Sequence, residues 1–150
     1  MTTRSTVRQL LSHKDPNIHT VPQTASVAEA INKMNSHRIG ALLVMEPSGR
    51  LTGIITERDI LRNIVGCEQA LDQTPVSRWM TRKVVCCTTD TCLEDAKSLM
   101  ARHHVRHLPV MDRQEQCMGL ISIQDVTAYQ AHDRQLVIRH LEDYMFAQRT

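Results

Sequence analysis

An internal repeat with a period of 66 residues constrains the fold more than any other feature of the sequence. Residues 19–61 align without a gap with residues 85–127, and nine of these 43 pairs are identical. The identical pairs fall at apolar and turn positions: Ala30/Ala96, Met34/Met100, His37/His103, Leu42/Leu108, Val44/Val110, Met45/Met111, Gly53/Gly119, Ile55/Ile121 and Asp59/Asp125. The chain therefore contains two copies of one structural unit.

Each copy has the pattern of a strand, a helix, two further strands and a second helix. In the first copy Ser26 and Glu29 have the spacing of a capping box, and apolar residues follow at helical spacing. A second helix begins after Thr56, and its counterpart begins after Ser122. Short apolar runs predict buried strands that pair as hairpins, and these runs lie at 41–45, 51–55, 108–111 and 117–121.

This pattern predicts an α/β (α+β) fold in which two β-α-β-β-α repeats lie between flanking N- and C-terminal helices. We place the first repeat at 7–66 and the second at 84–130, joined by a linker at 67–83 with a helical turn around 76–80. A short leading helix is expected within 5–13. The C-terminal segment 131–150 contains a longer helix at 133–148, whose apolar face is expected to pack on the repeats or on a second chain.

Composition narrows the functional classes. Hydrophobic residues make up 41% of the 150 residues, which is enough for a globular core. A net charge of +2 and four aromatic residues do not indicate a nucleic-acid partner, and no apolar run approaches the ~18 residues of a membrane span. The polar N-terminus lacks a secretory signal, and five cysteines without Cys-x-x-Cys spacing predict reduced thiols. We therefore expect a cytoplasmic protein with no nucleic-acid or membrane partner.

The most informative residues are Thr56 with Asp59 and Ser122 with Asp125, which occupy the same position in the two copies. One interpretation is structural, because Ser or Thr caps a helix and an acidic residue in the first turn suits the helix dipole. The other is functional. A carboxylate at a strand–helix turn can accept hydrogen bonds from two vicinal hydroxyls, as on a ribose, and the helix N-terminus favours an anionic group.

The hairpins followed by Gly53-Ile-Ile-Thr-Glu-Arg-Asp59 and Gly119-Leu-Ile-Ser-Ile-Gln-Asp125 resemble the cystathionine β-synthase (CBS) domain family. Two such motifs in one chain form a Bateman module. The resemblance covers about residues 7–130 and implies a stand-alone, pseudo-two-fold module with two clefts between the motifs. It further implies that these clefts bind an adenosyl ligand, which is AMP, ADP, ATP, NAD or S-adenosylmethionine.

The resemblance also implies which residues bind the ligand. Thr or Ser and Asp of each motif hold the ribose, and adenine meets the first strand and the strand after the first helix. The implied ligand-binding residues are Thr20, Val21, Gly40, Ala41, Leu42, Thr56 and Asp59 in the first copy, and Cys86, Cys87, Arg106, His107, Leu108, Ser122 and Asp125 in the second. The copies differ at Cys86 and Cys87, and at Gln124 in place of Arg58, so the two clefts are expected to be unequal.

Three basic residues bear on the choice of ligand. Arg58 precedes Asp59 at a helix start, and its alternative role is that of a solvated surface arginine. Arg106 and His107 come just before a buried strand, where similar modules often place basic residues that face the ligand phosphates. Arginine can bind a phosphate with two parallel hydrogen bonds, and histidine adds a pH-dependent donor. These cations favour AMP or another phosphate-bearing ligand over S-adenosylmethionine, which carries its own positive charge.

Other chemistries have less support in the sequence. His103, His104 and His107 lack the regular spacing of paired zinc ligands, so no metal site is predicted. No catalytic motif or activated nucleophile is evident, so we expect neither an enzyme nor a required cofactor. The expected function is an adenine-nucleotide sensor that forms a homodimer and signals to a partner protein, with the helix at 133–148 as a candidate contact surface. The alternative is a ligand-independent adaptor or dimerisation module.

Overall fold

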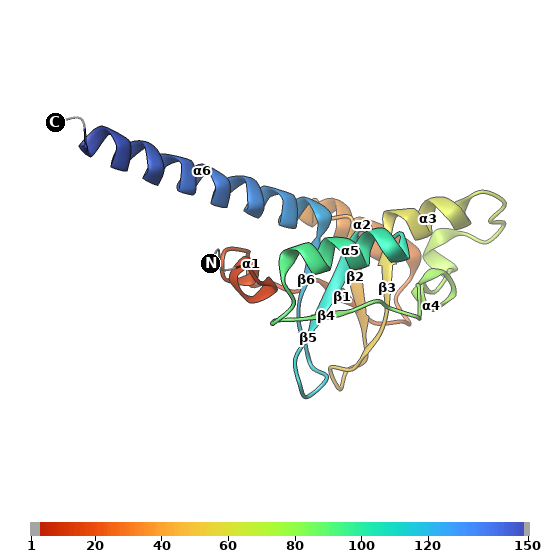
Figure 1. Ribbon diagram of the computed structural model, residues 1–150. Coiled ribbons are helices and arrows are strands. Elements are labelled where there is room, and N and C mark those ends of the chain that lie inside the picture. Colours follow the sequence, from red (N-terminus) through yellow and green to blue (C-terminus); the bar gives the residue numbers. More distant parts are fainter. Residues whose placement is uncertain (1–3, 149–150) are drawn as a thin grey trace.

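The computed structural model of the chain describes residues 4–148 and follows the predicted order of elements twice (Figure 1). The first repeat consists of β1 (Thr20–Val21), α2 (Val27–His37), β2 (Ala41–Met45), β3 (Leu51–Thr56) and α3 (Glu57–Ile64). The second consists of β4 (Cys87–Thr88), α5 (Leu93–His103), β5 (His107–Met111), β6 (Cys117–Ser122) and α6 (Ile123–Ala147). Outside these units lie α1 (Val7–Ser12), the 3-10 turn η1 (Leu71–Gln73) and α4 (Val76–Trp79).

The two sheets have the same topology and equivalent registers. In each, a short first strand pairs in parallel with a central strand, which pairs antiparallel with the third. Leu42 lies opposite Ile55, and Leu108 lies opposite Ile121, 66 residues further along the chain. The middle of each central strand is buried, in agreement with the apolar residues there.

Three apolar clusters stabilise this arrangement. The first lies inside repeat one and includes Val76 and Trp79 of α4, although α4 immediately precedes repeat two. The second lies inside repeat two and includes Val7 and Leu10 of α1, although α1 precedes repeat one. A third cluster, centred on Leu43, joins the two sheets. Each repeat is thus completed by the helix that leads into the other, so the two halves of the chain are interlocked.

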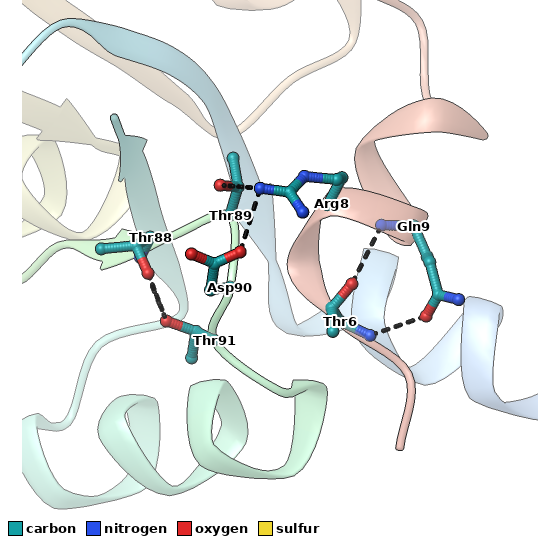
Figure 2. A network of polar contacts seen from close by, with 7 residues as sticks. All are labelled: Thr6, Arg8, Gln9, Thr88, Thr89, Asp90 and Thr91. Carbon is teal, nitrogen blue, oxygen red and sulfur yellow. Dashed lines mark hydrogen bonds and ion pairs between the residues drawn. The ribbon is translucent and has the colours of Figure 1, made fainter. Parts of the chain in front are cut away.

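Polar contacts attach α1 to repeat two. Thr6 begins α1 with a full capping box, in which Thr6 and Gln9 bind each other's backbone N–H groups. Arg8 donates hydrogen bonds to Thr89 Oγ1 at 3.1 Å and to Asp90 Oδ1 at 2.9 Å, in the loop between β4 and α5 (Figure 2). The Arg8 contacts hold the start of α1 beside repeat two.

One prediction about the helices is wrong. The sequence suggested a separate helix at 133–148, but α6 runs without a break from Ile123 to Ala147. Residues 131–135 contain neither Gly nor Pro, so nothing ends the helix there. Beyond residue 130 the helix projects from the rest of the molecule (Figure 1), and its apolar side chains, including Leu141 and Tyr144, are exposed. The last two residues of the predicted C-terminal segment, 149 and 150, lie outside the described residues.

Helix caps are predicted well at some ends and less well at others. Thr56 and Ser122 both form full capping boxes with the aspartates three residues on. Ser26 accepts from the Glu29 N–H, but the return bond of the predicted capping box is absent from the described structure. At its equivalent, Cys92, the side chain makes no capping hydrogen bond.

Candidate functional site

Both Thr/Ser-x-x-Asp motifs face one cavity of about 1400 Å³. The two clefts that the resemblance implies are continuous, because residues of both repeats and of the segments before them line the same space. Its volume is larger than a typical pocket for one small ligand, which is roughly 300–1,000 Å³. We call the side formed by Thr56, Asp59 and Thr81 the first wall, and the side formed by Ser122, Asp125 and Lys14 the second wall.

On the first wall, Asp59 is engaged by its own chain. Its Oδ2 accepts from the Thr56 backbone N–H at 2.9 Å and from Thr56 Oγ1 at 3.0 Å. Its Oδ1 accepts from Thr81 Oγ1 at 2.9 Å. Asp59 is only 9% exposed, so these bonds offset the cost of burying a carboxylate. Thr56 and Asp59 therefore have the helix-capping role that was one interpretation of the sequence. The same role places the Asp59 carboxylate at the cavity.

On the second wall, a lysine takes the place of the threonine hydroxyl. Lys14 Nζ lies 2.7 Å from Asp125 Oδ2, and the same oxygen accepts from the Ser122 backbone N–H at 2.9 Å. Lys14 Nζ also donates to the Leu120 carbonyl. Burial by itself would raise the pKa of the Asp125 carboxyl, but the hydrogen bonds from Lys14 and Ser122 outweigh it and lower the pKa. Asp125 is consequently a carboxylate at neutral pH.

The three predicted basic residues all line the cavity. Arg58 reaches across to repeat two, where its Nη1 donates to the His104 carbonyl at the end of α5, at 3.1 Å. Arg106 is exposed and lies just before β5. Burial lowers the pKa of His107, and the charges of Lys14 and Arg106 lower it further, while Asp125 opposes them. His107 is therefore neutral at pH 7, so arginine and lysine supply the positive charge.

The other predicted ligand-binding residues divide into two groups. Gly40 and Ala41 line the cavity along with the motif residues. The remainder are not among the lining residues: Thr20, Val21, Leu42, Cys86, Cys87 and Leu108. Leu42 and Leu108 are completely buried in the two cores. The resemblance assigned residues of the first strand of each repeat to ligand binding. The cavity is lined instead by the residues just before these strands, including His19 and Val85.

Burial disfavours the thiolate form of three cysteines, Cys86, Cys87 and Cys117. All five are free thiols. Burial raises the pKa of Cys87 to about 12, with the neighbouring Cys86 adding to the effect, and burial also raises the pKa of Cys86 itself.

Residues 4–148 hold no group of three His, Cys, Asp or Glu side chains placed to bind a metal ion. In the same residues, no helix is both long and apolar enough to cross a membrane.

Sequence reasoning missed Lys14, Thr81 and a pair of histidines. His19 and His37 lie with ring centroids 4.1 Å apart, and both line the cavity. Repetition of His37 as His103 was visible in the sequence, but the partner His19 has Val85 as its counterpart. Lys14 and Thr81 lie outside the aligned repeat, so periodicity carries no signal for either. Only the packing of α1 and α4 on the opposite repeats brings them to the motif aspartates.

Two interlocked βαββα units around a shared cavity define a class of tandem, pseudo-two-fold modules. The chain belongs to the CBS domain family: the CBS domain model matches residues 7–66 and 76–132. It is 37% identical over 114 residues to the CBS domain-containing protein YhcV of Bacillus subtilis, covering 75% of this chain and 79% of that one. A protein with CBS domains from Burkholderia ambifaria has the same fold, with a TM-score of 0.81 and 37% identity over 86% of this chain and 96% of that one.

Two structures of similar fold contain bound ligands. A CBS domain protein from Pyrobaculum aerophilum, 25% identical with a TM-score of 0.72 over 80% of this chain and 88% of that one, is complexed with AMP. The CBS pair of protein MJ0100, 21% identical with a TM-score of 0.76, holds 5′-methylthioadenosine and S-adenosylmethionine, and at this identity the likeness shows the fold alone. The chain spans 65% of a curated relative from Acidianus ambivalens and 18% of two relatives from Arabidopsis thaliana.

Proposed function

We propose that this chain is a regulatory module that binds an adenine nucleotide in its cavity and signals the bound state to a partner protein. The observation that supports this most directly is the placement of Asp59 and Asp125 on one cavity lined also by Arg58 and Arg106. Carboxylates accept hydrogen bonds from the hydroxyls of a ribose, and guanidinium groups bind phosphate. AMP is the preferred ligand, with ADP, ATP and NAD as variants and S-adenosylmethionine less suited to a basic cavity.

The rest of the proposal concerns how the signal leaves the molecule. A ligand changes a protein only through different affinities for two states. A nucleotide in this cavity would contact both repeats, and would therefore favour the state in which they are correctly spaced. We propose a homodimer in the cytoplasm, with the regulated partner on another chain. A relative named homoserine O-acetyltransferase matches over 23% of its own length, and we propose no enzymatic activity for the matched region.

Thermal unfolding of nucleotide-stripped protein tests the proposal. AMP, ADP, ATP, NAD and S-adenosylmethionine are added in parallel at concentrations up to millimolar. Ligand at 100 times Kd stabilises the folded state by about 2.7 kcal/mol. For a chain of this length, that corresponds to a rise in Tm of roughly 5–10 °C. We expect such a rise with AMP, and its absence with every ligand would contradict the proposal.

Variants identify the site. Asp59→Asn combined with Asp125→Asn should abolish the AMP-dependent rise while the protein still unfolds cooperatively. Asp72→Asn is the matched control, because Asp72 is exposed and does not line the cavity. A loss of the AMP effect in the control as well would show that the effect does not come from the motif aspartates.

The exposed apolar half of α6 favours one second candidate, a ligand-independent adaptor. Its exposed side chains include Leu136, Val137, Leu141 and Tyr144, and such surfaces mark sites of protein interaction. An adaptor would bind a partner through this surface with the cavity empty. The same thermal assay separates the two candidates, because an adaptor shows no response to any nucleotide, before or after the aspartates are replaced.

A further inference from the structure

The two motif aspartates are not chemically equivalent, although they occupy equivalent positions. Each accepts one hydrogen bond from the segment that leads into the other repeat. For Asp59 the donor is Thr81, a neutral hydroxyl that follows α4. For Asp125 the donor is Lys14, an ammonium group that follows α1. The second wall therefore carries a positive charge beside its carboxylate, and the first wall has a neutral hydroxyl at the equivalent place.

The first wall has little capacity left for a ligand. Both carboxylate oxygens of Asp59 are engaged, Oδ2 by Thr56 and Oδ1 by Thr81. With 9% of the residue exposed, a ribose hydroxyl would have to share or displace the Thr81 hydroxyl. The basic side chain next to this wall, Arg58, already has a hydrogen bond to the His104 carbonyl. A ligand that used this wall would have to compete with bonds that the protein already makes.

The second wall retains both a free acceptor and a free donor. Asp125 Oδ2 takes the bonds from Lys14 and Ser122, and Oδ1 accepts none from residues 4–148. Lys14 has three N–H donors, of which two are directed to Asp125 and to the Leu120 carbonyl. The side chains of Lys14 and Asp125 are 32% and 29% exposed. A ribose hydroxyl and an anionic group can therefore be bound here without breaking a hydrogen bond of the protein.

The distribution of charge also favours the second wall as the place where a phosphate binds. Lys14 and Arg106 both lie close enough to His107 to lower its pKa, so the two cations are near the same place on the cavity. Asp125 balances only one of them. A phosphate group beside Asp125 would therefore be attracted, whereas an uncharged nucleoside would gain only the hydroxyl contacts.

We propose that a phosphate-bearing nucleotide fills the second wall first and that Lys14, outside both repeats, is the residue that gives this wall its preference for phosphate. The inference rests on the proposed nucleotide-binding function and adds the order of filling and the specificity determinant. Lys14 holds Asp125 in place through one N–H and keeps another available for the anion. Thr81, its counterpart on the first wall, can orient a carboxylate but cannot attract an anion.

Calorimetric titration of stripped protein with AMP and with adenosine tests the role of Lys14. Lys14→Met removes the charge and keeps much of the side-chain volume. Because a hydrogen bond to a charged group is worth about 1.5–3 kcal/mol, we expect AMP to bind about tenfold to a hundredfold more weakly. Adenosine affinity should change by less than about threefold. Lys14→Arg should keep most of the AMP affinity. Thr81→Val, on the first wall, should weaken the tightest AMP site much less than Lys14→Met does. Lys97→Met is the matched control, because Lys97 is exposed and does not line the cavity.

Several results would overturn the inference. If Lys14→Met binds AMP as tightly as the wild type, Lys14 contributes nothing to AMP binding, and if it binds AMP more tightly, Lys14 blocks the ribose position. If Thr81→Val weakens AMP as much as Lys14→Met, the second wall has no priority. Wild-type protein that binds neither AMP nor adenosine refutes the proposed function itself. If the wild type binds AMP and Lys14→Met keeps the same preference for AMP over adenosine, only the role of Lys14 is refuted.

A measurement on the wild-type protein covers the case in which Lys14→Met fails to fold. Lysines are labelled with an amine-reactive acetylating reagent with and without AMP, and the modified sites are counted by mass spectrometry. We expect AMP to protect Lys14 several-fold and to leave the exposed Lys97, which does not line the cavity, unchanged. Equal labelling of Lys14 with and without AMP, under conditions where AMP binds, would contradict the proposal.

Discussion

Replacing Gly53 by alanine is the sharpest test of how α4 is held against repeat one. A Cβ at position 53 would lie 2.8 Å from the Thr81 carbonyl oxygen, about 0.6 Å inside an ordinary van der Waals contact. The obstacle is backbone, because Thr81 and Ile54 exchange hydrogen bonds of 3.0 and 2.8 Å through their main chains. The segment must therefore move away and lengthen both bonds.

The equivalent change at Gly119 is a matched control. There a Cβ would meet Leu11 Cδ2 at 3.0 Å, the end of a side chain that can rotate. Two weakened backbone hydrogen bonds, at about 1 kcal/mol each, and residual overpacking give a loss of about 2–3 kcal/mol for Gly53→Ala. Gly119→Ala should cost less than about 1 kcal/mol. At roughly 2–4 °C per kcal/mol, Tm should fall by about 5–10 °C in the first variant and by at most a few degrees in the second.

Thermal and urea unfolding of the two variants and the wild type, all stripped of nucleotide, measure the difference. Equal losses of stability in the two variants would refute the reasoning, since they would show that the backbone of Thr81 yields as easily as a leucine side chain.

Three further predictions follow from burial and charge. The pKa of Asp125 is lower in the folded state than its ordinary value of 3.8, so its contribution to stability is complete above about pH 4 and is lost as the pH falls through the folded value. Urea unfolding at pH 6 and pH 3 should show a smaller acid-induced loss in Asp125→Asn than in the wild type. Iodoacetamide at pH 8 should leave the buried Cys87 unmodified in folded protein and alkylate it in urea, as read by mass spectrometry. Truncation after residue 132 should change Tm by less than about 2 °C, because the removed part of α6 is exposed, and a larger fall would show that this segment is buried in an assembly.

Much of the architecture could be predicted from periodicity. Strand pairs such as Leu42 with Ile55 recur 66 residues later as Leu108 with Ile121, because each copy repeats the same local apolar pattern. The aspartates of the motifs were placed correctly at the first turn of a helix, because a capping box is defined by residues three apart. The length of α6 was predicted wrongly, since the apolar pattern changes near residue 131 while the helix continues.

The sequence by itself determined the duplicated fold, the position of each motif and the basic character near them, because these depend on residues close together in the chain. The tertiary structure alone decided what each motif aspartate meets. Lys14 reaches Asp125 across 111 positions, and Thr81 reaches Asp59 across 22, because α1 and α4 each pack on the repeat that they do not introduce. Burial of the apolar side chains of α1 and α4 in those cores fixes this arrangement, and no local sequence pattern indicates it.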